Sequence, residues 1–171
     1  MKKKLIALAI VSIATISGTT GANAQMVSNS TSSEYQRSLS ETTNPMTSPR
    51  ALKNFANTYK NVKDEMWLKT NDGFAVRFTS GGIRTTVLYD KKGYWTGSIK
   101  YYGEEKMLHE IRHDVKSKYY DYKIIYTQEI ETPDSEGMPT YVICVEDQAN
   151  IKLIRICDGE MSVWKEYTKN N

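Results

Sequence analysis

The chain has 171 residues, with 23 Lys and Arg against 20 Asp and Glu. Three of these lysines lie in residues 1–24, which hold no acid, so the rest of the chain has 20 basic and 20 acidic residues. A net charge near zero argues against nucleic-acid binding driven by counterion release, which needs a clustered basic face.

Residues 1–24 have the features of a secretory signal peptide. Lys2 to Lys4 form a positive start, Leu5 to Ile16 form an apolar run, and residues 22–24 (Ala-Asn-Ala) match a cleavage site before Gln25. The alternative is a retained N-terminal anchor, for which the apolar run is short. We therefore expect an exported protein, periplasmic or secreted, with no membrane insertion after cleavage.

Residues 25–47 are rich in Ser, Thr and Asn and have few bulky apolar side chains. Such a segment buries too little surface to offset the entropy cost of ordering, so we expect a disordered lead. Two similar units should follow, one over residues 48–102 and one over residues 103–171.

The first unit is expected to begin with a helix, capped by Ser48 and opened by Pro49. Its apolar residues recur with helical spacing at Leu52, Phe55, Ala56 and Tyr59. Four strands should follow, and the turn Asn71-Asp72-Gly73 is a strong hairpin signal. The expected strands are Glu65–Thr70, an alternating strand with Phe74, Val76 and Phe78 turned inward, Ile83–Tyr89 and Tyr94–Tyr102.

The second unit is expected to repeat this order. A helix over Glu104–Lys118 should bury Leu108, Ile111 and Val115. Its expected strands are Tyr120–Glu131, Met138–Glu146, Ile151–Cys157 and Glu160–Thr168. The predicted fold class is α+β, a tandem repeat of one helix plus a four-stranded antiparallel sheet. Whether the two groups of strands join edge to edge is left open.

Cys144 and Cys157 are the two cysteines, and an even number in an exported chain suggests a disulfide. In a hairpin of the last strands, however, Cys144 should lie opposite Leu153. Cys157 is then four residues further along, about 13 Å away at about 3.3 Å per residue. That separation favours two buried thiols over a bridge.

Residues 109–113 (His-Glu-Ile-Arg-His) match the H-E-x-x-H motif of zinc hydrolases, in which His109 and His113 would bind the metal and Glu110 would be the general base. Helical periodicity turns His109 and His113 away from the apolar stripe, toward solvent. We therefore prefer a solvated helix face and keep a zinc site at His109 and His113 as the alternative. Other catalytic motifs are absent, so we expect no enzyme activity and no cofactor.

Aromatic and basic residues in the first unit suggest a binding face. If alternation turns Phe74 and Phe78 inward, six residues fall on the opposite face: Trp67, Arg77, Arg84, Tyr94, Lys100 and Tyr102. Trp, Tyr and Arg are enriched in binding hot spots. Trp67 could equally belong to the core, because a shift of one residue in register moves a side chain to the other face.

Several of these features resemble one family. They are the Asn-Asp-Gly hairpin, the alternation over residues 74–78, the Gly82 turn and the run Leu88-Tyr89-Asp90-Lys91-Lys92-Gly93. The chain resembles the PepSY-like periplasmic proteins of Bacteroidetes, which are similar to the β-lactamase inhibitor protein. The resemblance implies a tandem helix-plus-sheet fold whose sheets grip an enzyme, or a domain that restrains a peptidase. The inhibitor has a disulfide in each lobe, whereas the first unit here has no Cys, so we transfer no functional residue.

The favoured hypothesis is a non-enzymatic periplasmic binding or inhibitor-like protein whose partner is a protein or peptide, such as a peptidase or another enzyme. The alternatives are a small zinc-dependent hydrolase and an envelope-associated structural module.

Overall fold

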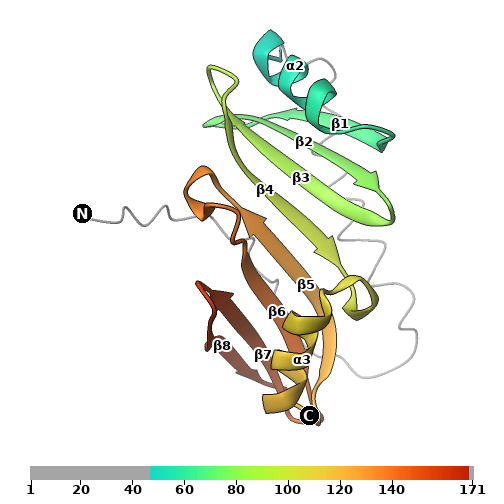
Figure 1. Cartoon of the computed structure of the whole chain (residues 1–171), viewed down its shortest axis with the longest axis vertical. Helices are drawn as coiled ribbons and strands as arrows, with labels where there is room; N and C mark the ends of the chain where they lie inside the picture. The colour runs from blue at the N-terminus through green and yellow to red at the C-terminus, as the bar shows by residue number, and fades with distance from the viewer. Residues whose placement is uncertain (1–46, 170–171) are drawn as a thin grey trace, which may run out of the picture.

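The computed structural model describes residues 47–169 (Figure 1). The predicted signal peptide (1–24) lies outside the described residues, and so does the predicted lead (25–47) except for Thr47. The helices are α2 (Pro49–Thr58) and α3 (His109–Lys118), with short 3-10 turns η1 (Glu104–Lys106) and η2 (Pro133–Ser135). The strands are β1 (Lys63–Lys69), β2 (Gly73–Ser80), β3 (Ile83–Asp90), β4 (Trp95–Tyr102), β5 (Lys123–Glu131), β6 (Thr140–Glu146), β7 (Asn150–Cys157) and β8 (Glu160–Thr168).

All eight strands form one antiparallel sheet in sequence order, which fans along the long axis of the molecule (Figure 1). The two groups of four strands join through β4 and β5, where Ser98–Tyr102 pairs with residues 127–131. The sequence left this connection open, and the structure shows a single sheet in place of two. The repeat relation between the two halves stays a prediction.

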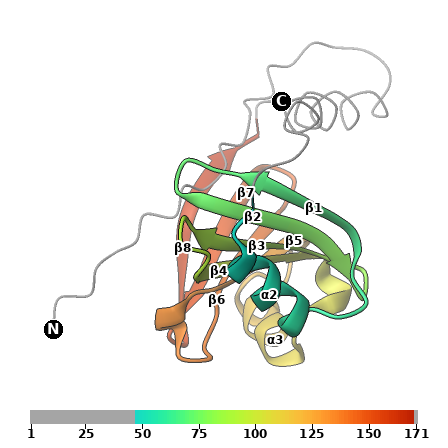
Figure 2. The same cartoon turned by 90° about the horizontal axis from the view of Figure 1, so that it is seen from above.

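Both helices pack against the same face of the sheet, as Figure 2 shows. Under α2, the side chain of Phe55 lies in a core cluster with Val76, Phe78 and Val87. This arrangement confirms the inward alternation of β2. Under α3, Val115 is fully buried against a second cluster from the later strands. Each helix therefore covers one half of the sheet with its own apolar core.

The start of α2 requires a glycine in a distant turn. Pro49 occupies the first turn as predicted, but the Ser48 hydroxyl donates to the Lys92 carbonyl at 3.4 Å instead of capping the helix. Gly93 in that turn has a φ of 82°, and a Cβ there would lie 2.2 Å from the Ser48 Oγ. The turn between β3 and β4 thus lies so close to the start of α2 that a side chain larger than glycine would clash there.

The second helix is shorter than predicted. Residues 104–106 form the separate turn η1, and α3 begins at His109 because the backbone of Leu108 is not helical, with φ −59° and ψ 135°. Leu108 is 58% exposed, so its expected place in the apolar stripe is wrong. Met107 packs on the second core in its place, together with Ile111.

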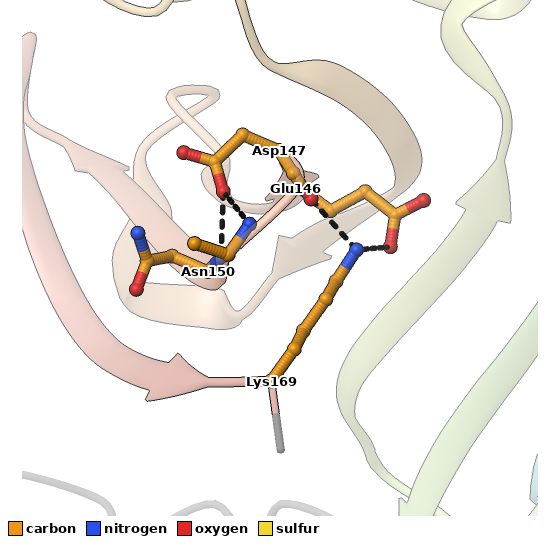
Figure 3. A network of polar contacts seen from close by, with 5 residues as sticks. Glu146, Asp147, Asn150 and Lys169 are labelled. Atoms are coloured by element: carbon orange, nitrogen blue, oxygen red, sulfur yellow. Dashed lines mark hydrogen bonds and ion pairs between the residues drawn. The ribbon is translucent and has the colours of Figure 1, made fainter. Parts of the chain in front are cut away.

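A polar network joins the residue after β8 to the turn between β6 and β7 (Figure 3). The carboxylate of Asp147 accepts backbone N–H bonds from Ala149 at 2.8 Å and Asn150 at 2.5 Å. The Nζ of Lys169 lies 2.7 Å from the Asp147 carbonyl oxygen and 3.0 Å from Glu146 Oε2. The chain beyond β8 is thereby tied to the β6–β7 turn. The Tyr122 hydroxyl and then the turn N–H groups lower the pKa of Asp147 to about 2.

The two cysteines are not bridged. Cys144 pairs with Leu153 in the β6–β7 ladder, as predicted, and Cys157 ends β7. Both thiols are free, with Cys144 buried and Cys157 partly exposed. Within residues 47–169, neither helix is long and apolar enough to cross a bilayer.

Candidate interaction surface

The sheet face opposite α2 and α3 is called the helix-free face below. Side chains alternate between the faces of a strand, so the ladder register assigns each residue to one face. Arg77 pairs with Thr86, and Arg84 pairs with Tyr101. These residues alternate with the core residues Val76, Phe78 and Val87 and therefore belong to the helix-free face.

Trp67 does not lie on the face on which it was predicted. It pairs with Val76 across β1 and β2, which places it on the helix side. Its ring lies 5.5 Å from that of Phe55 and 5.8 Å from that of Tyr89. The side chain therefore packs on the first core, as the alternative interpretation of this residue allowed.

Lys100 and Tyr102 also lie on the helix side, contrary to prediction. Lys100 pairs with Thr85, which alternates with Thr86 of the helix-free face. Lys100 Nζ is 2.6 Å from Glu129 Oε1, and the Tyr102 hydroxyl donates to Glu129 Oε2 at 2.7 Å. Burial, and then the Glu129 carboxylate, raise the pKa of Tyr102 well above its usual value. These contacts connect β4 to β5 across the junction of the two halves.

Tyr94 falls outside the predicted face because β4 begins one residue later, at Trp95. The guanidinium of Arg50 in α2 lies 4.1 Å from the centre of the Tyr94 ring. Arg77 and Arg84 are therefore the two of the six predicted residues that share the helix-free face.

A row of paired residues crosses the helix-free face perpendicular to the strands. From β3 to β7, each member pairs with the next, in the order Arg84, Tyr101, Gln128, Val142 and Arg155. The Arg84 guanidinium carbon is 5.3 Å from the Tyr101 ring centre, and the Gln128 amide donates to the Tyr101 hydroxyl. Arginine thus stands near both ends of a polar and aromatic row.

A third apolar cluster on the helix-free face overlaps this row at Val142. It comprises the buried residues Ile130, Val142, Cys144 and Leu153, against which Ile99, Tyr126, Ile151 and Trp164 pack. Burial, and then the neighbouring Cys144, raise the pKa of Tyr126 to about 12, so this phenol is neutral at ordinary pH. Neither α2 nor α3 contributes to this cluster.

This cluster was not predicted from the sequence, although β6 carries a signal for it. Every residue from Tyr141 to Val145 is buried, where a strand covered on one face would alternate. The apolar run Tyr-Val-Ile-Cys-Val thus indicates a strand with apolar neighbours on both faces. Gln128, Arg155 and Trp164 could be assigned to the helix-free face only after the register of β5 to β8 was known.

The histidine pair of the alternative zinc site lies on the surface of α3. The rings of His109 and His113 are nearly parallel, with centres 6.3 Å apart, and both residues are exposed. Residues 47–169 contain no group of three or more His, Cys, Asp or Glu side chains arranged to hold a metal. A catalytic zinc needs about three protein ligands, and the pair supplies two.

An open hollow of about 510 Å³ lies near the β1–β2 turn. Its lining residues are Lys69, Thr70, Asn71, Gly73, Phe74 and Lys91. The polar side chains of this lining are two lysines, a threonine and an asparagine.

Comparison with known proteins identifies the fold. No protein-family model and no curated protein matches the sequence. A BLIP-like protein from Bacteroides fragilis superposes with a TM-score of 0.60 at 14% identity, over 77% of this chain and 93% of that chain. A DUF2874 family protein from Bacteroides ovatus gives 0.58 at 13% identity, over 73% and 89%. A Bacteroides eggerthii protein proposed to be periplasmic gives 0.56 at 13% identity, over 72% and 90%.

These identities are too low to transfer a function, but the superpositions cover most of each chain. The chain has a BLIP-like α+β fold, built on one eight-stranded antiparallel sheet with few helices.

Proposed function

We propose that the chain is a non-enzymatic periplasmic protein that binds a protein or peptide partner through its helix-free face. The third apolar cluster carries this proposal. Two helices cover the first and second clusters, whereas neither covers the cluster of Ile130, Val142, Cys144 and Leu153. An apolar centre with Tyr, Trp and Arg around it has the composition of a protein-binding surface.

The surroundings of the cluster support the same proposal. Tyr167 and Met66 belong to the helix-free face by register and remain 43% and 39% exposed. Large apolar side chains left in solvent are stabilised when a partner covers them, by about 25 cal/mol for each Å² of apolar surface removed from water. The face therefore has apolar area to bury on both sides of the cluster.

The periplasmic location and the class of partner are supported by other observations. Residues 1–24 have the pattern of an export signal, and a structural relative from Bacteroides eggerthii is proposed to be periplasmic. The resemblance to PepSY-like proteins and to the β-lactamase inhibitor protein favours an enzyme, such as a peptidase, as the partner. In this proposal the two helix-plus-four-strand halves are one unit used twice, which makes a sheet broad enough to contact a folded protein.

The experiment introduces a bulky, uncharged side chain on the helix-free face to prevent a partner from binding there. Thr86 is half-buried on the helix-free face between Arg77 and Ile99, so Thr86→Trp adds a large ring there. Ser117→Trp on the exposed surface of α3 is the matched control. Both tagged variants are compared with wild type for the amount of each partner captured from a cell-envelope extract of the native host.

We expect Thr86→Trp to lose the captured partners and Ser117→Trp to retain them, at melting temperatures close to wild type. If Thr86→Trp captures the same partners in the same amounts, the helix-free face is not the binding surface.

A further inference from the structure

Charge on the helix-free face is unevenly distributed. By ladder register, its basic residues are Lys63, Arg77, Arg84, Lys123, Arg155 and Lys165. Its acidic residues are Asp90, Glu146 and Glu160, and each of them is the first or last residue of its strand. Away from the β1 bulge, the described interior of the face therefore holds cations and no acid.

Two of the three acids already have partners. An Asp90 oxygen accepts N–H bonds from Lys92 and Tyr94, both at 2.8 Å, and Glu146 forms an ion pair with Lys169. Two of the interior arginines differ from these acids. Arg84 and Arg155 are both exposed and take part in none of the ion pairs formed within residues 47–169.

The helix side of the same sheet shows the contrast. There, Lys100 is paired with Glu129 at 2.6 Å, and Lys152 with Glu166 at 3.0 Å. Lys100 and Lys152 thus have carboxylates in the neighbouring strand, whereas Arg84 and Arg155 have Tyr101 and Val142 as ladder neighbours. The imbalance is local to the helix-free face.

We propose that the helix-free face binds an extended acidic segment of its partner, with one carboxylate at Arg84 and a second at Arg155. This inference rests on the proposed function and names the chemistry of the partner. Guanidinium groups form forked, bidentate bonds with carboxylates, so an arginine at each end fixes both the position and the direction of a bound segment.

The row sets the spacing of the two carboxylates. Arg84 lies in β3 and Arg155 in β7, four inter-strand steps apart, or about 19 Å at about 4.8 Å per step. An extended segment advances about 3.3 Å per residue, so its two acids should be about six residues apart. Between them, the segment would cross Tyr101, Gln128 and Val142, which suit polar and apolar side chains.

The test uses fluorescein-labelled heptapeptides and fluorescence anisotropy at low ionic strength. The probe carries glutamate at both ends of a Val-Thr-Tyr-Thr-Val centre. One control peptide replaces both glutamates by lysine, and another has the same composition with the two glutamates adjacent. The protein variants are Arg84→Gln, Arg155→Gln and the double variant. Lys91→Gln combined with Lys118→Gln removes the same charge from exposed positions outside the face.

We expect the glutamate-ended probe to bind more tightly than both control peptides. Each arginine substitution should weaken its binding by about three- to tenfold, and the lysine control should leave it unchanged. Binding should fall at about 1 M salt, where charges are screened beyond about 3 Å.

Three results would overturn the inference: equal binding of the lysine-ended peptide, undiminished binding in the double arginine variant, or no binding of the glutamate-ended probe. None of these depends on capture by the Thr86→Trp variant. Suppose that Thr86→Trp loses the captured partners but the arginine substitutions leave peptide binding unchanged. The proposed function would then stand, and the acidic segment would not be what the face binds.

Discussion

Glu129 makes the polar contacts at the middle of the sheet. Its two carboxylate oxygens receive Lys100 and Tyr102 from the neighbouring strand. The Glu129 side chain is 15% exposed, so a carboxylate oxygen that lost its partner would have few water contacts. The sequence could not assign these residues correctly, because alternation shows which residues share a face within one strand but not how adjacent strands align.

Tyr102→Phe should lower the free energy of unfolding by about 1–2 kcal/mol, because it removes a hydroxyl bonded to a carboxylate and keeps the ring. Urea unfolding at neutral pH measures the change. Tyr120→Phe is the control, since Tyr120 is 81% exposed and should show almost no effect. Equal effects for the two variants would mean that the Tyr102–Glu129 bond adds no stability.

The lowered pKa of Asp147 predicts how the stability of the chain changes in acid. Its pKa is lowered from 3.8 to about 2 in the folded chain, so its contribution to stability is fully present above about pH 4. That contribution is lost as the pH falls through about 2. Asp147→Asn should therefore be less stable than wild type at pH 7, and the difference should shrink between about pH 4 and 2. Urea unfolding across this range measures it, and a constant difference would contradict the assignment.

At the scale of elements, most local signals in the sequence were reliable, whereas most assignments of the predicted binding residues to a face of the sheet were not. The Asn71-Asp72-Gly73 turn closes the β1–β2 hairpin, and Pro49 opens α2, as predicted. The errors arise where register matters. The β1–β2 ladder shifts between Lys63 and Met66, and the β3–β4 ladder shifts at Leu88. Each bulge moves the following side chains to the other face, and no pattern within a single strand reveals it.

The attachment of α2 gives a prediction at this scale. Phe55 is 4% exposed and contacts the rings of Tyr59, Trp67 and Phe78, whereas Leu52 on the same helix is 43% exposed. Phe55→Ala should cost about 3–5 kcal/mol through lost contacts and a cavity. Leu52→Ala should cost less than about 1 kcal/mol. Thermal unfolding compares the two, and similar losses would contradict the packing of α2 described here.

At the scale of the whole molecule, one sheet has two unlike faces. Two helices cover one face, and the other combines an apolar cluster with a row that ends in arginines. The sequence predicted the α+β class and the order of the elements because these depend on local patterns. It could not predict that residues from β4 to β8 form one surface, since that surface depends on the β4–β5 pairing and on every later register.

The most direct measurement is a photo-crosslinking map of the two faces. The photoreactive residue p-benzoylphenylalanine replaces Met66 or Tyr167 on the helix-free face, and Leu52 or Tyr120 elsewhere, all four being exposed. After irradiation in a cell-envelope extract of the native host, we predict the same crosslinked partner from Met66 and Tyr167 and none from Leu52 or Tyr120. Crosslinks to that partner from Leu52 or Tyr120, with none from Met66 or Tyr167, would contradict the account.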